Sequence, residues 1–156
     1  MKSLTPQQAK EQIRRYCAYQ ERSHQEVRNK LYSYRLHGND VDDILTSLIT
    51  DGFLNEERFA KAFSGGKFRM KKWGRIKISH ALESKGVSTN CIRIGLREID
   101  DESYLKTLRE LLADKRQSLP QDNPFALREK LSTYAIHKGY EPDLVWKEIY
   151  ELIPKK

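Results

Sequence analysis

The sequence lacks the patterns that mark membrane and secreted proteins. No apolar run approaches the ~18 residues of a membrane-spanning helix, and the start, Met-Lys-Ser-Leu-Thr-Pro, leads into polar sequence unlike a signal peptide. Only two cysteines occur, Cys17 and Cys91, each in a segment with helical apolar spacing, which predicts two buried free thiols and no disulfide. We therefore expect a cytoplasmic protein that does not bind membranes.

Patterns typical of catalysis, cofactors and metals are also missing. No glycine-rich phosphate loop follows a strand, and no cysteines and histidines stand at metal-ligand spacing. The acidic cluster at residues 98–102 could bind a metal or act in acid–base chemistry, but its position at a helix junction favours capping. We expect no catalytic residue, no cofactor and no metal site, and therefore not an enzyme. The histidines are scattered along the chain: His24, His37, His80 and His137.

Positive charge is present, and it is concentrated in one stretch. The whole chain carries 29 basic and 22 acidic residues, a net charge of +7. The segment from Lys61 to Lys85 holds eight lysines and arginines and one acid, Glu83, so it alone accounts for +7. A basic excess confined to one segment indicates a polyanion or an acidic protein surface as partner.

A helical wheel divides the first half of this stretch into two faces. Phe59, Phe63, Met70 and Trp73 fall on one side, while the bases and Phe68 fall on the other. An aromatic ring within a basic face is suited to stacking on bases or anchoring a protein interface. Alternatively, the bases form a solvated face and Phe68 packs on an adjacent repeat. The candidate contact residues for DNA or a protein partner are Lys61, Lys67, Phe68, Arg69, Lys71, Lys72, Arg75 and Lys77.

The apolar spacing and cap signals predict an all-helical chain. The predicted helices cover approximately residues 6–20, 24–38, 40–51, 55–73, 75–86, 88–99, 100–116, 123–139 and 142–152. Ser23 and Glu26 form a capping box, which explains their spacing as a structural feature. Gly65 and Gly66 each cost about 1 kcal/mol in a helix interior, so we expect the basic helix to be weakened or bent there.

Three glycines, at positions 38, 86 and 139, indicate an internal repeat. When Gly38, Gly86 and Gly139 are superposed, apolar residues coincide six and ten positions later, and a helix flanks each glycine on both sides. The spacing fits three tandem three-helix repeats, at residues 1–52, 53–99 and 100–156. Such units are stabilised by stacking, which predicts an elongated, curved helical array with the charge on its central repeat.

Three blocks of residues resemble the RecX family. The first is Arg22-Ser23-x-x-Glu26 with Leu31. The second is Leu48-x-x-x-Gly52-Phe53-Leu54-Asn55-x-x-Arg58-Phe59-Ala60. The third is Lys72-x-Gly74-x-x-x-Ile78 followed by Leu82-x-x-x-Gly86-Val87. The blocks cover roughly residues 16 to 99, and the last three helices match only in rhythm. Asn55 and Glu56 replace the family's usual acidic pair, and Ser64-Gly65-Gly66 replaces helix-forming residues.

The resemblance implies a small helical regulator of the RecA recombinase, usually an inhibitor, that lies in the groove of the RecA filament on DNA. The expected partners are the RecA filament and single- or double-stranded DNA, bound weakly and without sequence specificity by a monomer. The implied processes are DNA recombination, DNA repair and the SOS response. No catalytic residues carry over, because the family has none.

Two other functions stay open from the residues themselves. A stand-alone DNA-binding protein of helix-turn-helix type would place the helix after Gly74 in a groove and bind a specific duplex without RecA. An enzyme such as a nuclease would use the acidic cluster near Asp100 and show metal-dependent turnover. The effect on RecA activity discriminates among the three.

Overall fold

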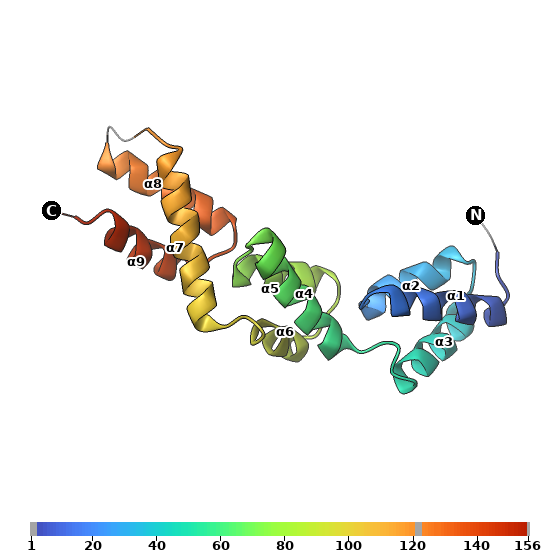
Figure 1. Ribbon diagram of the computed structural model, residues 1–156. Helices are drawn as coiled ribbons and strands as arrows, with labels where there is room; N and C mark the ends of the chain where they lie inside the picture. Colours follow the sequence, from blue (N-terminus) through green and yellow to red (C-terminus); the bar gives the residue numbers. More distant parts are fainter. Residues whose placement is uncertain (1–2, 121–122, 156) are drawn as a thin grey trace. The chain divides into compact units, whose positions relative to one another are not determined.

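The structure is a computed structural model that describes residues 3–120 and 123–155; residues 1, 2, 121, 122 and 156 lie outside the described part. Helices and connecting loops make up all the described residues, without a strand. This confirms the predicted all-α class. The helices are α1 Pro6–Tyr19, α2 His24–Ser33, α3 Gly38–Thr50, α4 Glu56–Lys71, α5 Arg75–Ser84, α6 Thr89–Leu96, α7 Asp101–Gln117, α8 Pro124–His137 and α9 Pro142–Leu152 (Figure 1).

The chain divides into two compact units, and the division falls within α4. Unit 1 contains residues 1–63 and 82–95, and unit 2 contains residues 64–81 and 96–156. In unit 1, helices α1, α2 and α3 pack against one another (Figure 1). In unit 2, α7, α8 and α9 do the same. The three-helix grouping of the fold is therefore as predicted, while the exact repeat boundaries stay a proposal.

Each unit has an apolar core supplied by the predicted helix faces. The core of unit 1 includes Ala9, Ile13, Val27, Leu31, Val41, Leu45, Leu48 and Leu54. The core of unit 2 includes Tyr104, Leu108, Leu112, Leu131, Ala135, Tyr140, Val145 and Ile149. Each fully buried leucine or isoleucine stabilises the fold by about 1.5–3 kcal/mol relative to exposure, so these clusters dominate the stability of each unit.

Three helix joints share one backbone pattern, which corrects the predicted repeat register. A residue with positive φ follows the end of one helix, the next residue is apolar and buried, and a new helix starts two residues after that buried residue. The positive-φ residues are Arg35 (65°), Gly86 (78°) and Gly139 (102°). The buried residues are Leu36, Val87 and Tyr140. The superposition on Gly38 is therefore wrong by three residues, because Gly38 is the first residue of α3 and Arg35 takes the left-handed position.

Side-chain caps occur at most of the predicted helix starts. The Ser23 hydroxyl accepts from the Glu26 N–H at 3.0 Å, and the Glu26 carboxylate accepts from the Ser23 N–H at 2.8 Å, so the capping box is confirmed. Asn55 accepts from the Arg58 N–H at 2.8 Å at the start of α4. Asp100 accepts from the Ser103 N–H at 3.0 Å, which confirms the capping role predicted for the acidic cluster. Asp40 does not cap α3: the helix begins two residues earlier, and its N-cap His37 makes no side-chain capping bond.

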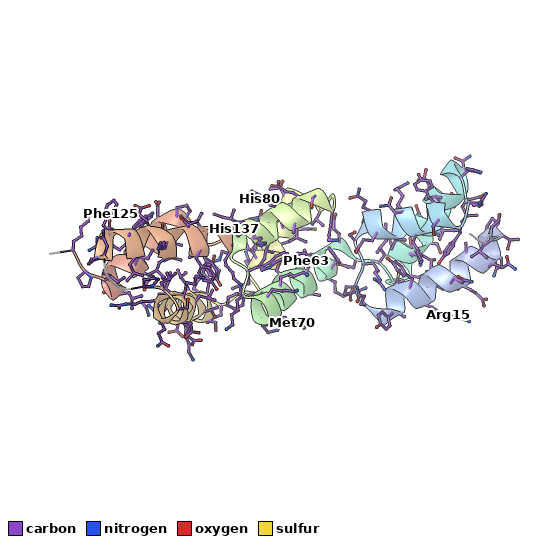
Figure 2. The ribbon with its side chains drawn as sticks, turned by 90° about the horizontal axis from the view of Figure 1, so that it is seen from above. Arg15, Phe63, Met70, His80, Phe125 and His137 are labelled. Carbon is purple, nitrogen blue, oxygen red and sulfur yellow. The ribbon has the colours of Figure 1, made fainter. Side chains whose placement is uncertain are left out.

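The predicted apolar face of α4 is wrong in its second half. Met70 is 85% exposed and points into solvent (Figure 2), whereas Phe68 is only 8% exposed. The wheel assumed a single buried stripe along the helix. In the structure, residues up to Phe63 belong to unit 1 and residues from Ser64 onward belong to unit 2, so the two halves serve different cores. The helix also ends at Lys71, two residues before Trp73.

Both cysteines are free, as predicted, but only one is fully buried. Cys17 lies in the core of unit 1, where burial raises the pKa of its thiol. Cys91 on α6 is half-buried.

Within residues 3–120 and 123–155, none of the helices combines the length and apolarity needed to span a bilayer.

Replacing Ser23 with alanine tests the structural role of the capping box. Ser23→Ala removes the acceptor for the Glu26 N–H and should lower the free energy of unfolding by about 1 kcal/mol, measured by urea denaturation. Ser3→Ala, at an exposed serine before α1, is the matched control and should change stability little. The folded Ser23→Ala protein should keep its binding activity; loss of binding without loss of structure would assign Ser23 a direct contact.

Candidate nucleic-acid interface

The predicted contact residues separate into structural and surface side chains. Phe68 packs against Tyr104 in the core of unit 2, with ring centroids 5.9 Å apart, so its ring is not available to stack on a base. Lys61 lies in unit 1 and forms an ion pair with Glu57 at 3.5 Å. Arg69 is exposed, and its guanidinium lies beside Gly65.

Trp73 is the aromatic residue that lies among the bases. The ammonium groups of Lys67 and Lys77 are 5.0 Å and 4.8 Å from the centroid of its ring, which is cation–π distance. The sequence placed Trp73 on the apolar face of α4. The structure instead places it after the helix end, because Lys72 adopts φ 57° and the Trp73 N–H returns to the Lys67 carbonyl.

A close backbone contact holds this segment against the α8–α9 joint. The Gly74 N–H donates to the Lys138 carbonyl at 2.8 Å, and the Ile76 N–H donates to the Gly139 carbonyl at 2.9 Å. A Cβ atom on Gly74 would lie 2.2 Å from the Gly139 carbonyl carbon, and a Cβ atom on Gly139 would lie 2.4 Å from that of Lys77. Both positions therefore require glycine, whose missing side chain permits this approach.

The same contact brings Lys138 to the basic segment. Its ammonium donates to the Lys71 carbonyl at 3.3 Å, and the neighbouring Tyr140 hydroxyl donates to the Lys72 carbonyl at 2.9 Å. Lys138 lies far from the basic stretch in sequence. Its place in the interface could have been inferred only by recognising that the next residue, Gly139, packs against another backbone. We define the central basic surface as Lys67, Lys71, Lys72, Lys77 and Lys138.

Arg75, by contrast, is enclosed in a polar network. Its guanidinium pairs with Asp101 at 2.6 Å and Glu141 at 3.2 Å, and it stacks 3.8 Å from the centroid of the Tyr104 ring. The Tyr104 hydroxyl accepts from the Arg75 N–H at 3.0 Å and donates to Glu141. With its charge balanced by two carboxylates, Arg75 orders the start of α5 and is not a free cation on the surface.

Burial raises the pKa of the two tyrosines that lie beside this network, Tyr104 and Tyr140. Tyr104 and Tyr140 stack with centroids 4.9 Å apart. Burial, reinforced by the hydrogen bond to Glu141, raises the pKa of Tyr104 far above its ordinary value, and burial likewise raises that of Tyr140. The surroundings of both rings therefore favour the neutral phenol over the phenolate.

Four lysines of the central basic surface are not balanced by a carboxylate in the described part of the chain. Within residues 3–120 and 123–155, Lys71, Lys72, Lys77 and Lys138 form no ion pair with a carboxylate. Lys71 and Lys72 are exposed, and Lys77 is half-buried beside Trp73. Such a cluster attracts phosphates or carboxylates of a partner.

In the described ranges, no group of three histidine, cysteine or acidic side chains could hold a metal ion.

The residues of the second sequence block have structural roles at the entrance to α4. Arg58 pairs with Glu21 at 2.5 Å and donates to the Gly52 carbonyl at 2.9 Å, and Gly52 itself has φ 80°. A Cβ atom on Gly95 would lie 2.6 Å from the Ala60 carbonyl oxygen, so glycine lets α6 approach α4 closely. These residues fix the fold of unit 1 and are not candidates for partner contact.

Sequence comparison identifies the central segment. Residues 55–96 match the model of the RecX second three-helix domain. A Regulatory protein RecX of Prosthecochloris aestuarii is 28% identical over 138 residues, covering 88% of this chain and 89% of the relative. A Regulatory protein RecX of Clostridium acetobutylicum is 24% identical over 136 residues, covering 85% of this chain but 61% of the relative.

Comparison with solved structures supports the fold. A crystal structure of RecX from Lactobacillus salivarius has a TM-score of 0.83 and 22% sequence identity, and the match covers 94% of this chain and 96% of that one. At this identity the likeness establishes the fold alone. The chain spans about half to three-fifths of the Clostridium and Bacillus mycoides relatives, at 61% and 52% of their lengths.

The fold and the basic surface define a small all-helical protein built from three-helix groups, with a cluster of lysines near one tryptophan. The matched domain, the relatives and the structural neighbours agree on one family. Residues 55–96 match a RecX domain, and the chain as a whole is similar to RecX regulatory proteins.

The contact between Gly74 and Gly139 can be tested with two glycine substitutions. Gly74→Ala forces a Cβ atom against backbone and should destabilise the protein by about 1–3 kcal/mol. Gly66→Ala is the matched control, because a Cβ atom there meets nothing within 4 Å, and it should stabilise α4 by about 0.5–1 kcal/mol. Thermal unfolding of both variants measures the difference. A Gly74→Ala protein as stable as the parent would show that the two backbones are not in contact.

Proposed function

We propose that this protein regulates the RecA recombinase by binding the RecA–DNA filament and lowering RecA activity in recombination, DNA repair and the SOS response. The observation that carries the proposal is the central basic surface of unit 2. Its Lys71, Lys72, Lys77 and Lys138 form no ion pair with a carboxylate in the described part of the chain. The ammonium group of Lys77 lies 4.8 Å from the centroid of the Trp73 ring. All of these lysines except Lys138 fall within the segment that matches the RecX second domain. The protein would act as a cytoplasmic monomer, without catalytic residues.

The chemistry of this surface favours a polyanion over a neutral partner. Lysine ammonium groups act as strongly hydrated point charges that suit phosphate oxygens without fixed geometry. Binding through such groups is not specific for sequence, which is appropriate for a regulator of a filament that forms on any DNA. The same lysines could contact carboxylates of RecA, and the experiment below separates the two partners.

The helix-turn-helix alternative has less support. A recognition helix contacts base edges through its exposed amino-terminal residues. Here the first residue of α5, Arg75, is held by Asp101, Glu141 and Tyr104, and the segment before it packs on Gly139. The enzyme alternative also has less support, because two acids of its cluster have structural roles: Asp100 caps α7 and Asp101 pairs with Arg75.

A triple variant of the basic surface tests the proposal. Lys71→Gln, Lys72→Asn and Lys77→Gln together remove three charges, with asparagine chosen at 72 because it tolerates positive φ. If each lysine contacts a phosphate, the log–log salt dependence of binding should fall by ~0.9 per contact on duplex and ~0.7 on single strands. The readouts are fluorescence anisotropy on labelled DNA and RecA ATPase activity.

The control removes three exposed lysines of unit 2 that lie elsewhere: Lys106→Gln, Lys130→Gln and Lys147→Gln. It has the same net charge as the test variant and should retain DNA binding and RecA inhibition. Loss of RecA inhibition with unchanged DNA binding would assign the surface to RecA carboxylates. A folded test variant that binds DNA and inhibits RecA like the parent would refute the proposed role of this surface.

A further inference from the structure

A second group of cations and aromatic rings lies in unit 1, on helices α1 and α2 and the segment between them. The side chains line a surface cavity of about 420 Å³. The cations that line it are Arg15, Arg22 and Lys30, and the rings are Tyr16, Tyr19 and Tyr34. None of these residues belongs to the basic stretch or to the central basic surface, so the cavity is unexplained by the function proposed above.

The cavity is organised by contacts between its cations and its rings. The guanidinium of Arg22 lies 3.7 Å from the centroid of the Tyr16 ring, and its Nε donates to the Tyr16 carbonyl at 3.0 Å. The ammonium of Lys30 lies 5.4 Å from the Tyr16 centroid and 5.9 Å from that of Tyr34. These contacts hold two positive charges beside aromatic surface.

No carboxylate among the described residues forms an ion pair with these cations. The cavity has no carboxylate in its lining, and Arg15, Arg22 and Lys30 form no ion pair in the described part of the chain. Glu26 lines an adjoining hollow that shares Tyr16 and Lys30, but it accepts from the Ser23 N–H and pairs with Lys85 at 3.5 Å. The three cations are therefore left to bind an external anion.

One ring of the cavity is presented to solvent. Tyr19, near the end of α1, is 82% exposed, and the Arg22 guanidinium lies 5.9 Å from its ring centroid. Arg15, one helical turn earlier, is exposed and extends from α1 (Figure 2). A ligand that touches both would combine a flat apolar face with a negative charge. Nucleotides have both features, whereas acidic peptide side chains lack the flat face.

We propose that this cavity binds a nucleotide unit of single-stranded nucleic acid, with the base stacked on Tyr19 and the phosphate held by Arg15 and Lys30. The cavity volume falls within the roughly 300–1,000 Å³ of small-ligand sites, which suits one nucleotide and not a duplex. A single strand also exposes the base face that a duplex hides. The site goes beyond the proposed function, because it lies in unit 1 and needs no RecA.

The test is an NMR titration of the ¹⁵N-labelled full chain with a four-nucleotide oligothymidylate and, separately, with thymidine 5′-monophosphate. Amide shifts should change in α1 and α2 with both probes, and the tetranucleotide should bind more tightly. Tyr19→Ala should weaken tetranucleotide binding at this site by about 5- to 150-fold, the equivalent of ~1–3 kcal/mol per stacked base. The double variant Arg15→Gln with Lys30→Gln should lower the salt slope by ~0.7 per lost phosphate contact.

Two controls make the result specific. Tyr32→Ala removes an exposed tyrosine of α2 that lines neither hollow, and the pair Lys106→Gln with Lys147→Gln matches the charge change in unit 2. Both should bind like the parent. Tyr16 is left intact because it packs on the core of unit 1.

Three outcomes would overturn the inference. In the first, the probes shift no amide in α1 or α2. In the second, Tyr19→Ala and Tyr32→Ala bind the tetranucleotide equally. In the third, a pentaglutamate peptide shifts the α1 and α2 amides as strongly as the tetranucleotide, which would make the site a carboxylate site. The triple variant of the central basic surface should leave all the α1 and α2 shifts in place, so failure of the proposed RecA function is distinguishable from failure of this site.

Discussion

The contact between the backbones of Gly74 and Gly139 is the constraint on which the arrangement of unit 2 depends. Two hydrogen bonds join Gly74 and the first turn of α5 to the α8–α9 joint at a separation that no side chain would permit. That separation brings Lys138 to the Lys71 carbonyl and the Tyr140 hydroxyl to the Lys72 carbonyl. The positions of the surface lysines are thus set by buried backbone geometry and not by attraction among the lysines themselves, which repel one another.

The basic stretch serves two purposes that its composition does not distinguish. Phe68 is buried in the aromatic cluster with Tyr104, and the half-buried Arg75 pairs with two carboxylates. Lys71 and Lys72 remain at the surface with their charges unbalanced. A count of basic residues along this stretch therefore overestimates the positive charge that a partner meets, because an acid from elsewhere in the chain neutralises Arg75.

The sequence predicted the helical class, the three-helix grouping and most of the caps, because these depend on local spacing and on short-range hydrogen bonds. The capping box at Ser23 needs only residues three apart, so it could be read directly. The burial of Phe68 could not be predicted in this way, because a helical wheel assumes one buried face and α4 contributes to two units. The contribution of Lys138 was also hidden, because it depends on a contact between glycines 65 residues apart in sequence.

Lys72 has a backbone conformation that a lysine adopts only at a cost. Its φ of 57° lies in the left-handed region, which disfavours side chains by roughly 1–2 kcal/mol, and at the corresponding positions after α3, α5 and α8 the chain uses glycine. At the end of α4, Lys72 therefore adds a positive charge to the surface at a cost in backbone free energy. Selection for stability alone would favour glycine there, and the unbalanced cation would disappear from the surface with no change in the fold.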